Sequence, residues 1–316
     1  MKNATEPHPD RERLLRELTT RLGERSRPVL DRLPTPELLY LSWREDLQER
    51  YADPHRGALL LEWEMSAVER GERACEEIAT GSPVDWKRAR ALDVGCGDGG
   101  FLVAFARRGA RAFGLDLSEG NIEGANERGR AWQLPIATAV GSAVSLAHPN
   151  ACFDVLTCGD VLEHLGQPDV ALNEIWRVLR PGGLLWLAAP TRYLFSNLWR
   201  DPHYGFFGIS VLPRRAAAWY LARVRRALST PERYEVERLP TYGTTIATLR
   251  RLGFEIVAGE YRPMAALRDP NLVRSRWKKR LLERLVAFGL QGPLTLAYRL
   301  SAELVWPLRL VCRKPR

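Results

Sequence analysis

The sequence is poor in cysteine and histidine and has no Cys/His spacing typical of a metal site. Its 316 residues include five of each. The five cysteines form no C-x-x-C pair, which argues against a zinc site. Their odd number argues against a disulfide framework, so a reducing compartment is expected. The cysteines are Cys75, Cys96, Cys152, Cys158 and Cys312.

Long apolar runs are also missing. Residues 1–20 are rich in Arg and Glu and contain no apolar stretch, so no secretory signal peptide is expected and a cytoplasmic location is predicted. In the C-terminal segment, the longest uncharged run, 285–298, has 14 residues and is interrupted by Gly292 and Pro293. A membrane-spanning helix needs about 20 residues, so this run is too short to cross a bilayer.

An excess of positive charge is missing except at one end of the chain. Residues 262–316 contain 13 Lys or Arg and 3 Asp or Glu. The rest of the chain contains 34 Lys or Arg and 35 Asp or Glu. The net charge of +9 therefore comes from the C-terminal segment alone. This distribution argues against nucleic-acid binding by the whole protein, and no basic groove interleaved with aromatic residues is evident. The 45% hydrophobic content excludes a disordered chain.

From residue 89 onward, short apolar runs alternate with helical patterns. This alternation predicts βαβ units, hence a parallel sheet with helices on both faces that binds ligands beyond the carboxyl ends of its strands. The predicted strands are 91–94, 112–117, 136–140, 153–158, 184–189, 254–259 and 308–312. The predicted helices are 101–108, 119–131, 170–179 and 244–252.

Four segments are expected along the chain. Residues 1–85 have the leucine spacing and charge of helices, broken by prolines. After Pro190 the regular pattern lapses until about Tyr242, and this stretch contains an aromatic-rich part, 193–213. We expect a helical extension over 1–85, a core over 86–260 with an insertion at 191–240, a basic amphipathic helical segment over 261–305, and a last strand and tail over 306–316.

A glycine-rich loop follows the first predicted strand. Gly95, Gly97 and Gly100 match G-x-G-x-x-G, and Asp116 lies where a ribose-binding acid is expected. Glycines allow the sharp turn and the close approach of a ligand to the main chain. On these residues alone, a nicotinamide enzyme, a methyltransferase and a glycine turn without a ligand all remain open.

Five motifs in order extend the pattern: ALDVGCGDGG, GLDLS, FDVLTCGDVLEHL, EIWRVLRPGGLLWLAAPTR and TLRRLGFEI. Together they resemble the class I S-adenosylmethionine-dependent methyltransferases, most of all the small-molecule branch that includes quinone and sugar O-methyltransferases. The resemblance covers 88–192 strongly and 241–260 more weakly. It implies a Rossmann-like, doubly wound, mostly parallel sheet of seven strands, with S-adenosylmethionine as cofactor.

The resemblance also implies roles for individual residues. Asp93 would hold the methionine end of the cofactor, and Gly95 and Gly97 would let the cofactor lie against the main chain. Asp116 would accept hydrogen bonds from both ribose hydroxyls, a task suited to a carboxylate, although a helix cap is the other interpretation. The remaining cofactor-binding candidates are Cys96, Leu117, Ser142, Ala143 and Gly159.

One candidate departs from the family pattern. Ser142 stands where relatives commonly have an Asp that binds the adenine amino group. A serine hydroxyl is neutral and shorter, so cofactor affinity is reduced or the main chain binds the adenine instead.

Methyl transfer to oxygen needs alignment of the reacting atoms and a base for the acceptor proton. His164, in the run that begins at Asp160, follows the fourth predicted strand. His203 lies in the insertion, where relatives build the acceptor pocket, within the motif at 201–205. Asp160, His164 and His203 are the catalytic candidates; a structural histidine is the other interpretation of His164, and a turn that of His203.

A divalent metal is a further possibility implied by the resemblance. In some quinone O-methyltransferases the run matching Asp160, Glu163 and His164 is associated with such an ion, and a helical spacing of three would place the two acids on one face. Three residues are not enough to predict a metal site, so none is assigned.

The C-terminal basic segment allows two interpretations. A run of five Lys and Arg between residues 274 and 280 precedes an apolar stretch with Phe and Tyr. Residues 272–305 therefore form either a peripheral contact with a membrane or a pair of helices packed on the core.

The sequence thus predicts an enzyme that methylates an oxygen of a small-molecule, glycan or lipid-linked acceptor. Methylation of nitrogen or carbon in a natural product is an alternative. A non-catalytic cofactor-binding subunit of the same fold is another, for which Ser142 would be the first sign of lost function. A nicotinamide oxidoreductase is the third.

Overall fold

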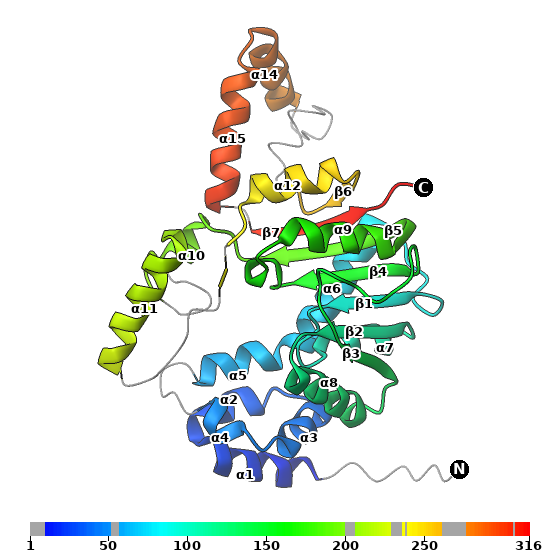
Figure 1. Cartoon of the computed structure of the whole chain (residues 1–316), viewed down its shortest axis with the longest axis vertical. Coiled ribbons are helices and arrows are strands. Elements are labelled where there is room, and N and C mark those ends of the chain that lie inside the picture. The colour runs from blue at the N-terminus through cyan, green and yellow to red at the C-terminus, as the bar shows by residue number, and fades with distance from the viewer. Residues whose placement is uncertain are drawn as a thin grey trace. The chain divides into compact units, whose positions relative to one another are not determined.

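The computed structural model describes residues 10–51, 57–199, 206–228, 236–237, 239–260, 276–305 and 307–316 (Figure 1). Within these ranges, one seven-stranded sheet has the order β3-β2-β1-β4-β5-β7-β6. The strands are β1 (Arg90–Val94), β2 (Arg111–Asp116), β3 (Ile136–Val140), β4 (Phe153–Gly159), β5 (Leu179–Ala189), β6 (Glu255–Ala258) and β7 (Leu308–Arg313).

Strand direction follows from the connections. The pairs β1–β2, β2–β3 and β4–β5 are parallel, whereas β7 is antiparallel to both β5 and β6. Parallel neighbours need crossovers, and helices supply them in this chain. The doubly wound, mostly parallel sheet predicted from the sequence is therefore confirmed.

The chain forms two compact units. The first comprises Met1–Glu76 and Val84–Ser142, and the second comprises Glu77–Pro83 and Ala143–Arg316. This division differs from the segments expected from the sequence, because the N-terminal helices group with the first three strands. The helices of the first unit are α1 (Arg11–Leu22), η1 (Glu24–Ser26), α2 (Arg27–Leu30), α3 (Thr35–Trp43), α4 (Leu47–Arg50), α5 (Gly57–Met65), most of α6 (Ala67–Gly81), α7 (Gly100–Arg107) and α8 (Glu119–Ala131).

The N-terminal helices have a core of their own. Helix α1 begins at Asp10, whose Oδ1 accepts a hydrogen bond from the Glu12 N–H over 3.0 Å. Its spaced leucines lie on one face and pack against those of α2 and α3. Ala131 of α8 belongs to the same cluster, so this core extends onto the helix that follows β2. The buried leucines include Leu14, Leu15, Leu18, Leu30, Leu38 and Leu41.

The second unit contains helices in the stretch where the sequence pattern lapses. Helix α11 brings Ala217 and Leu221 into a cluster with Ile209, Val236 and Leu239. Its buried side is narrow and flanked by arginines and alanines, which explains why periodicity alone missed it. The helices of this unit are η2 (Leu162–His164), α9 (Pro168–Val178), α10 (Phe195–Trp199), η3 (Ile209–Val211), α11 (Arg214–Leu228), α12 (Tyr242–Arg251), α14 (Arg276–Ala287) and α15 (Gln291–Val305).

Helices α14 and α15 form a hairpin before β7 (Figure 1). The C-terminal part of α15 is anchored on α12, because the Glu303 carboxylate accepts hydrogen bonds from the N–H groups of Tyr242 (2.9 Å) and Gly243 (2.7 Å). An acidic side chain at the N-terminus of a helix is electrostatically favourable. None of the helices that the structure describes has the length and apolar character needed to cross a membrane.

Candidate functional site

The loop after β1 is held in a fixed shape by glycines and by the neighbouring strand. Gly95, Gly97 and Gly99 have φ values of 74°, 50° and 83°, a region that favours glycine. The N–H groups of Gly95 and Cys96 both donate to the carbonyl of Leu115 in β2 over 2.9 Å. Contacts within the protein therefore define the shape of the loop.

The two sides of this loop differ in the space they leave. A Cβ atom placed at Gly99 would lie 2.9 Å from the Cβ of Ala125 in α8, and one at Gly100 would lie 2.4 Å from that of Ala67 in α6. A Cβ atom at Gly97 would meet no atom within 4 Å. The loop thus packs tightly against helices but leaves its main chain open at Gly97, as a ligand lying against the backbone requires.

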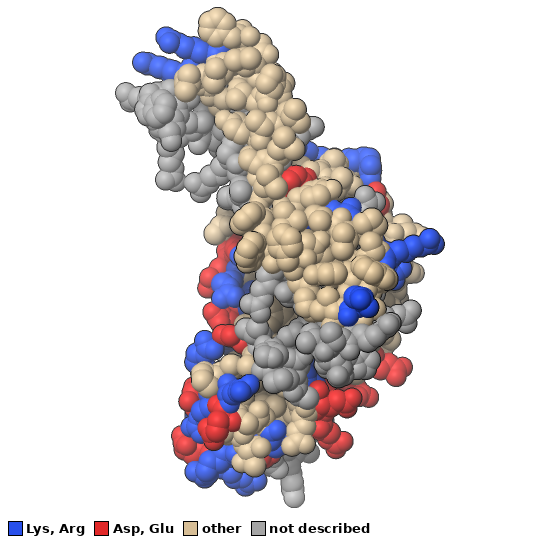
Figure 2. Space-filling model, turned by 90° about the vertical axis from the view of Figure 1, so that its left-hand side faces the viewer, with Lys and Arg blue, Asp and Glu red and all other residues tan. Residues whose placement is uncertain are grey.

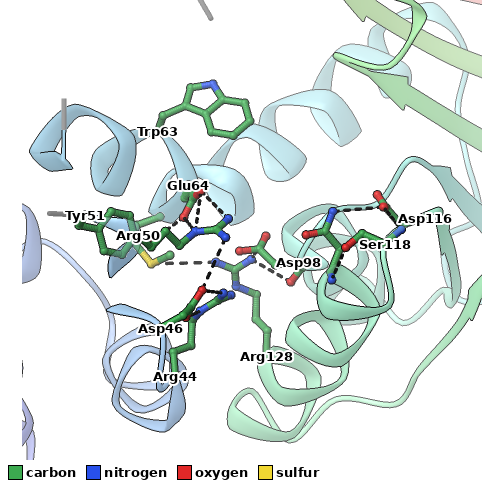
Figure 3. Close-up of polar contacts among 12 residues, drawn as sticks. Arg44, Asp46, Arg50, Tyr51, Trp63, Glu64, Asp98, Asp116, Ser118 and Arg128 are labelled. Atoms are coloured by element: carbon green, nitrogen blue, oxygen red, sulfur yellow. Dashed lines mark hydrogen bonds and ion pairs between the residues drawn. The ribbon is translucent and has the colours of Figure 1, made fainter. Parts of the chain in front are cut away.

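Asp116 stands at the end of β2 beside this open main chain. Its Oδ2 accepts a hydrogen bond from the Gly97 N–H (3.0 Å), and its Oδ1 accepts from the Ser118 N–H (2.9 Å) and from Asn121 Nδ2 (3.1 Å). Figure 3 shows the carboxylate next to Ser118 at the start of α8. A carboxylate has about four acceptor positions, and these bonds take three. Asp116 is thus fixed in orientation and still half-exposed, with acceptor capacity for a ribose hydroxyl.

The other cofactor candidates of the first unit have different environments. Asp93 and Cys96 are buried, and the thiol of Cys96 is so close to Gly114 that a Cβ there would lie 2.9 Å from its sulfur. Burial raises the pKa of this thiol, so Cys96 contributes main chain rather than a reactive sulfur. Leu117 is 68% exposed directly after Asp116, and Ser142 is half-buried. An exposed apolar side chain there is able to pack against a flat ring.

The remaining candidates belong to the second unit, with Ala143 shortly after β3 and the others at or after the end of β4. Ala143 is buried and Gly159 is half-buried. A Cβ atom placed at Gly159 would lie 3.0 Å from the ring of Trp186. Asp160 and His164 are both exposed. Asp160 has a φ of 56°, an uncommon conformation for a non-glycine residue, and its N–H donates to the carbonyl of Ala188 in β5.

The possible metal ligands do not share one environment. Asp160 has a left-handed backbone conformation and lies before η2 begins. The two acids, Asp160 and Glu163, therefore do not share one helical face as the sequence predicted. Glu163 is fully buried, whereas Asp160 and His164 are exposed. Among the described residues, no group of three His, Cys, Asp or Glu side chains is placed to hold an ion. Asp160, Glu163 and His164 therefore do not fit a divalent metal ion.

One catalytic candidate cannot be placed. His203, with the whole of 201–205, lies outside the described residues, so its role stays a prediction.

The sequence reasoning missed a buried arginine beneath the cofactor loop. Arg128 of α8 is fully buried; its Nη1 donates to the Asp98 carbonyl over 2.9 Å and also forms an ion pair with the Asp98 carboxylate. The signal was the sequence ANERGRA, in which charged residues alternate with Gly and Ala on a helix that must pack against a sheet. Figure 3 shows Arg128 directed at Asp98.

Comparisons with known proteins agree with this geometry. Residues 92–187, which include the glycine loop, Asp116 and the end of β4, match the family described as "Methyltransferase domain". Residues 92–187 are thus a class I S-adenosylmethionine-dependent methyltransferase domain. This confirms the family resemblance and the cofactor inferred from it, and the open main chain at Gly97 next to Asp116 fits that cofactor.

Two curated relatives of this methyltransferase are ubiquinone biosynthesis O-methyltransferases. The protein from Methylococcus capsulatus is 39% identical over 110 residues, which are 34% of this chain and 46% of the relative. The protein from Xanthomonas oryzae pv. oryzae is 34% identical over 150 residues, 43% of this chain and 62% of the relative. The match thus spans about half to three-fifths of each relative's length.

A solved structure supports the methyltransferase fold. A protein from Galdieria sulphuraria, assigned provisionally as a sarcosine dimethylglycine methyltransferase, superposes with a TM-score of 0.50 at 17% identity. The match covers 80% of this chain and 88% of the other. At this identity the likeness establishes the fold alone.

Proposed function

We propose that this methyltransferase transfers a methyl group from S-adenosylmethionine to an oxygen atom of a small-molecule acceptor. The observation that carries the proposal is the anchored Asp116 carboxylate beside the open main chain of Gly97. The activity named for the Methylococcus and Xanthomonas relatives supports oxygen as the methylated atom. A hydroxyl of a quinone, a glycan or a lipid-linked compound is the acceptor class that we expect.

Residues of the first unit bind and orient the cofactor in this proposal. Bound S-adenosylmethionine supplies a methyl group on a positively charged sulfur. Asp93 and the main chain of Gly95 and Gly97 hold the methionine end, and Asp116 accepts hydrogen bonds from the ribose. Leu117 packs its exposed side chain against the adenine. Fixing these parts aligns the methyl group for in-line attack, which is the main source of rate enhancement in such a transfer.

A histidine serves as the base in this proposal. The acceptor oxygen forms its new bond to the methyl carbon while the carbon–sulfur bond breaks, and the acceptor proton passes to an imidazole nitrogen. His164 is our first choice because it is exposed beyond the end of β4. His203 is the second choice.

The test of the reaction is direct. The purified protein is incubated with S-adenosylmethionine and a panel of quinols, glycans and polyketides, and products are analysed by mass spectrometry. We expect one acceptor to gain one CH2 unit. Formation of S-adenosylhomocysteine without an oxygen-linked product would favour nitrogen or carbon methylation, and no turnover with any acceptor would favour the non-catalytic subunit.

Base catalysis has its own test in two histidine variants. His164→Asn removes the proposed base, while His148→Asn changes a histidine whose ring packs edge-on against Phe153, 5.0 Å between centroids. We expect only the first variant to lower kcat and to flatten the dependence of rate on pH. Equal pH profiles in both variants would remove His164 from the mechanism.

We further propose that the enzyme works in the cytoplasm at a membrane surface, which the α14–α15 hairpin contacts. The hairpin exposes apolar side chains that the described part of the chain leaves uncovered. Leu296, Leu300 and Leu304 recur every four residues along α15 and are 60%, 58% and 44% exposed. Phe288, in the turn between the helices, is 81% exposed.

Charge indicates what kind of surface covers these side chains. Arg280 and Arg284 of α14 are exposed, whereas Glu283 is engaged by Lys279 at 4.0 Å. Figure 2 shows the hairpin as a largely tan surface with blue side chains near its end. Apolar side chains next to basic ones suit an anionic bilayer, and burial of each Phe or Leu side chain contributes about 1.5–3 kcal/mol.

Vesicle sedimentation tests this contact. The native chain should sediment with phosphatidylcholine vesicles that contain phosphatidylglycerol, and less with phosphatidylcholine alone. Two double variants should no longer sediment with the vesicles. One is Phe288→Ser with Leu290→Ser, and the other is Arg280→Glu with Arg284→Glu. Val170→Ser on α9, which also alters an exposed apolar side chain, is the control and should sediment as the native chain does. Sedimentation of the two double variants equal to that of the native chain would refute the contact.

A further inference from the structure

Asp98 has a special place in the cofactor loop. It lies between Gly97 and Gly99, both of which have positive φ, so its main chain is part of the turn itself. A single guanidinium nitrogen, Nη1 of Arg128, contacts both its carbonyl oxygen and its carboxylate. The shape of the loop therefore depends on where Arg128 is held.

Arg128 is held by helix α3 of the N-terminal extension. Its Nη2 donates to Oε2 of Glu37 over 3.2 Å, and its Cζ lies 4.2 Å from the ring centroid of Tyr40. Glu37 is also buried and accepts a second hydrogen bond, from Nε1 of Trp132, over 2.7 Å. Two residues of α3 thus enclose a buried cation that comes from α8.

Helix α3 also reaches the loop directly. The Tyr40 hydroxyl donates to Oδ2 of Asp98 over 3.0 Å and accepts from Nη1 of Arg44 over 2.8 Å. Arg44 in turn donates to Asp46 over 2.6 Å. Figure 3 shows these ion pairs continuing outward, with Arg50 bound to Glu64. The direct contacts between the cofactor loop and α3 are thus those of Tyr40 and Arg128, and further ion pairs follow in the N-terminal helices.

Ion pairing makes the loop and α3 depend on each other. Arg128 forms ion pairs with two acids that are largely removed from water, Asp98 and Glu37, and burying any of the three charges without a partner is costly. If α3 moved away, Arg128 would lose Glu37, and Asp98 would lose the Tyr40 hydroxyl. The position of Asp98 within the cofactor loop therefore depends on contacts with α3.

We infer that Asp98, Arg128 and Tyr40 are positioning residues that make binding of S-adenosylmethionine conditional on docking of the N-terminal helices. The inference rests on the proposed cofactor site and adds a partner to it within the chain. Coupling of this kind is reciprocal: a ligand that needs the docked loop must stabilise docking by the same factor. Bound cofactor should therefore protect α3, although none of the proposed cofactor contacts involves that helix.

Two tyrosines make a matched test. Tyr40→Phe removes the hydroxyl that touches Asp98 and keeps the ring beside Arg128. Tyr51→Phe removes a hydroxyl from the same extension that binds Glu64 instead. Binding of S-adenosylhomocysteine is measured by calorimetry, and amide hydrogen exchange in 35–43 is measured with and without it.

We expect Tyr40→Phe to weaken S-adenosylhomocysteine binding about tenfold, the value of one hydrogen bond to a charged group. It should also reduce the protection of 35–43 that the ligand induces. Tyr51→Phe should lower the melting temperature without either effect. Arg128→Met should weaken S-adenosylhomocysteine binding further. If Arg128→Met does not fold, Glu37→Gln is used in its place.

The outcomes separate this inference from the proposed function. If the native chain does not bind S-adenosylhomocysteine, the proposed function fails. Suppose instead that the native chain binds S-adenosylhomocysteine, that Tyr40→Phe and Tyr51→Phe bind it equally well, and that the ligand does not change amide exchange in 35–43. The coupling is then wrong while the proposed function stands.

Discussion

The main-chain N–H of Gly97 donates a hydrogen bond to Oδ2 of Asp116 over 3.0 Å. This contact joins the loop after β1 to the end of β2, the two places from which a methyltransferase of this class holds its cofactor. It also orients the Asp116 carboxylate, and a side chain held in its binding orientation by the protein loses less conformational entropy when a ligand binds.

Gly97→Ala tests whether the open space at the loop belongs to the cofactor. The new methyl group would enter that space, and the φ of 50° would add backbone strain of about 1 kcal/mol. Affinity for S-adenosylhomocysteine, measured by calorimetry, should fall more than the strain explains.

Gly208→Ala is the control for Gly97→Ala, because Gly208 also has a positive φ (71°) and no atom within 4 Å of an added Cβ. The control should lower stability by a similar amount and leave binding unchanged. Equal affinities for the two variants would contradict an occupied space at Gly97.

Acid should weaken the network around Asp98. Burial raises the pKa of this carboxyl, but the charge of Arg128 and the hydrogen bonds from Arg128 and Tyr40 outweigh burial and lower the pKa below its ordinary value of 3.8. The stabilisation is therefore complete above that value and is lost as the pH falls through the lowered pKa. Urea unfolding of the native chain should show this loss, and Asp98→Asn should show a shallower dependence on pH. Identical pH dependence would mean that Asp98 is not ionised in the folded protein.

The cysteines should differ in reactivity toward an aromatic disulfide reagent at about pH 8. Burial raises the pKa of Cys75 and of Cys312 to about 12, so both thiols stay protonated. Cys96 and Cys158 are buried as well, whereas Cys152 is half-buried. One thiol should react quickly in the folded protein and five after unfolding.

Cys152→Ser should abolish the fast reaction of the folded protein. Rapid modification of a second thiol would show that one of the buried sites opens readily.

Local patterns made much of the fold predictable. The strand at 136–140 and the helix at 119–131 have the bounds expected from the sequence, because apolar runs and a Ser118 cap mark their ends. Strand β5 begins earlier than expected, at Leu179. Its first residues were not predicted as strand because they include a Pro-Gly-Gly stretch, which is typical of a turn. Helix α11 was missed because its buried side is narrow.

The candidate site also has a part that the sequence predicted and a part that it did not. The glycine loop and Asp116 were predicted, because a strand, a turn and a helix in succession specify them. The contacts of α3 were not, since Tyr40 lies 58 residues from Asp98 and Glu37 lies 91 residues from Arg128. Such pairs are formed by packing, and a single sequence contains no periodicity that would indicate them.

Calorimetric titration of S-adenosylhomocysteine into the native chain and into Asp116→Ala tests the account most directly. The account predicts saturable binding of one ligand by the native chain, and a loss of at least tenfold in affinity when the carboxylate is removed, as expected for hydrogen bonds to a charged group. Absence of binding to the native chain, or equal affinity in Asp116→Ala, would contradict it.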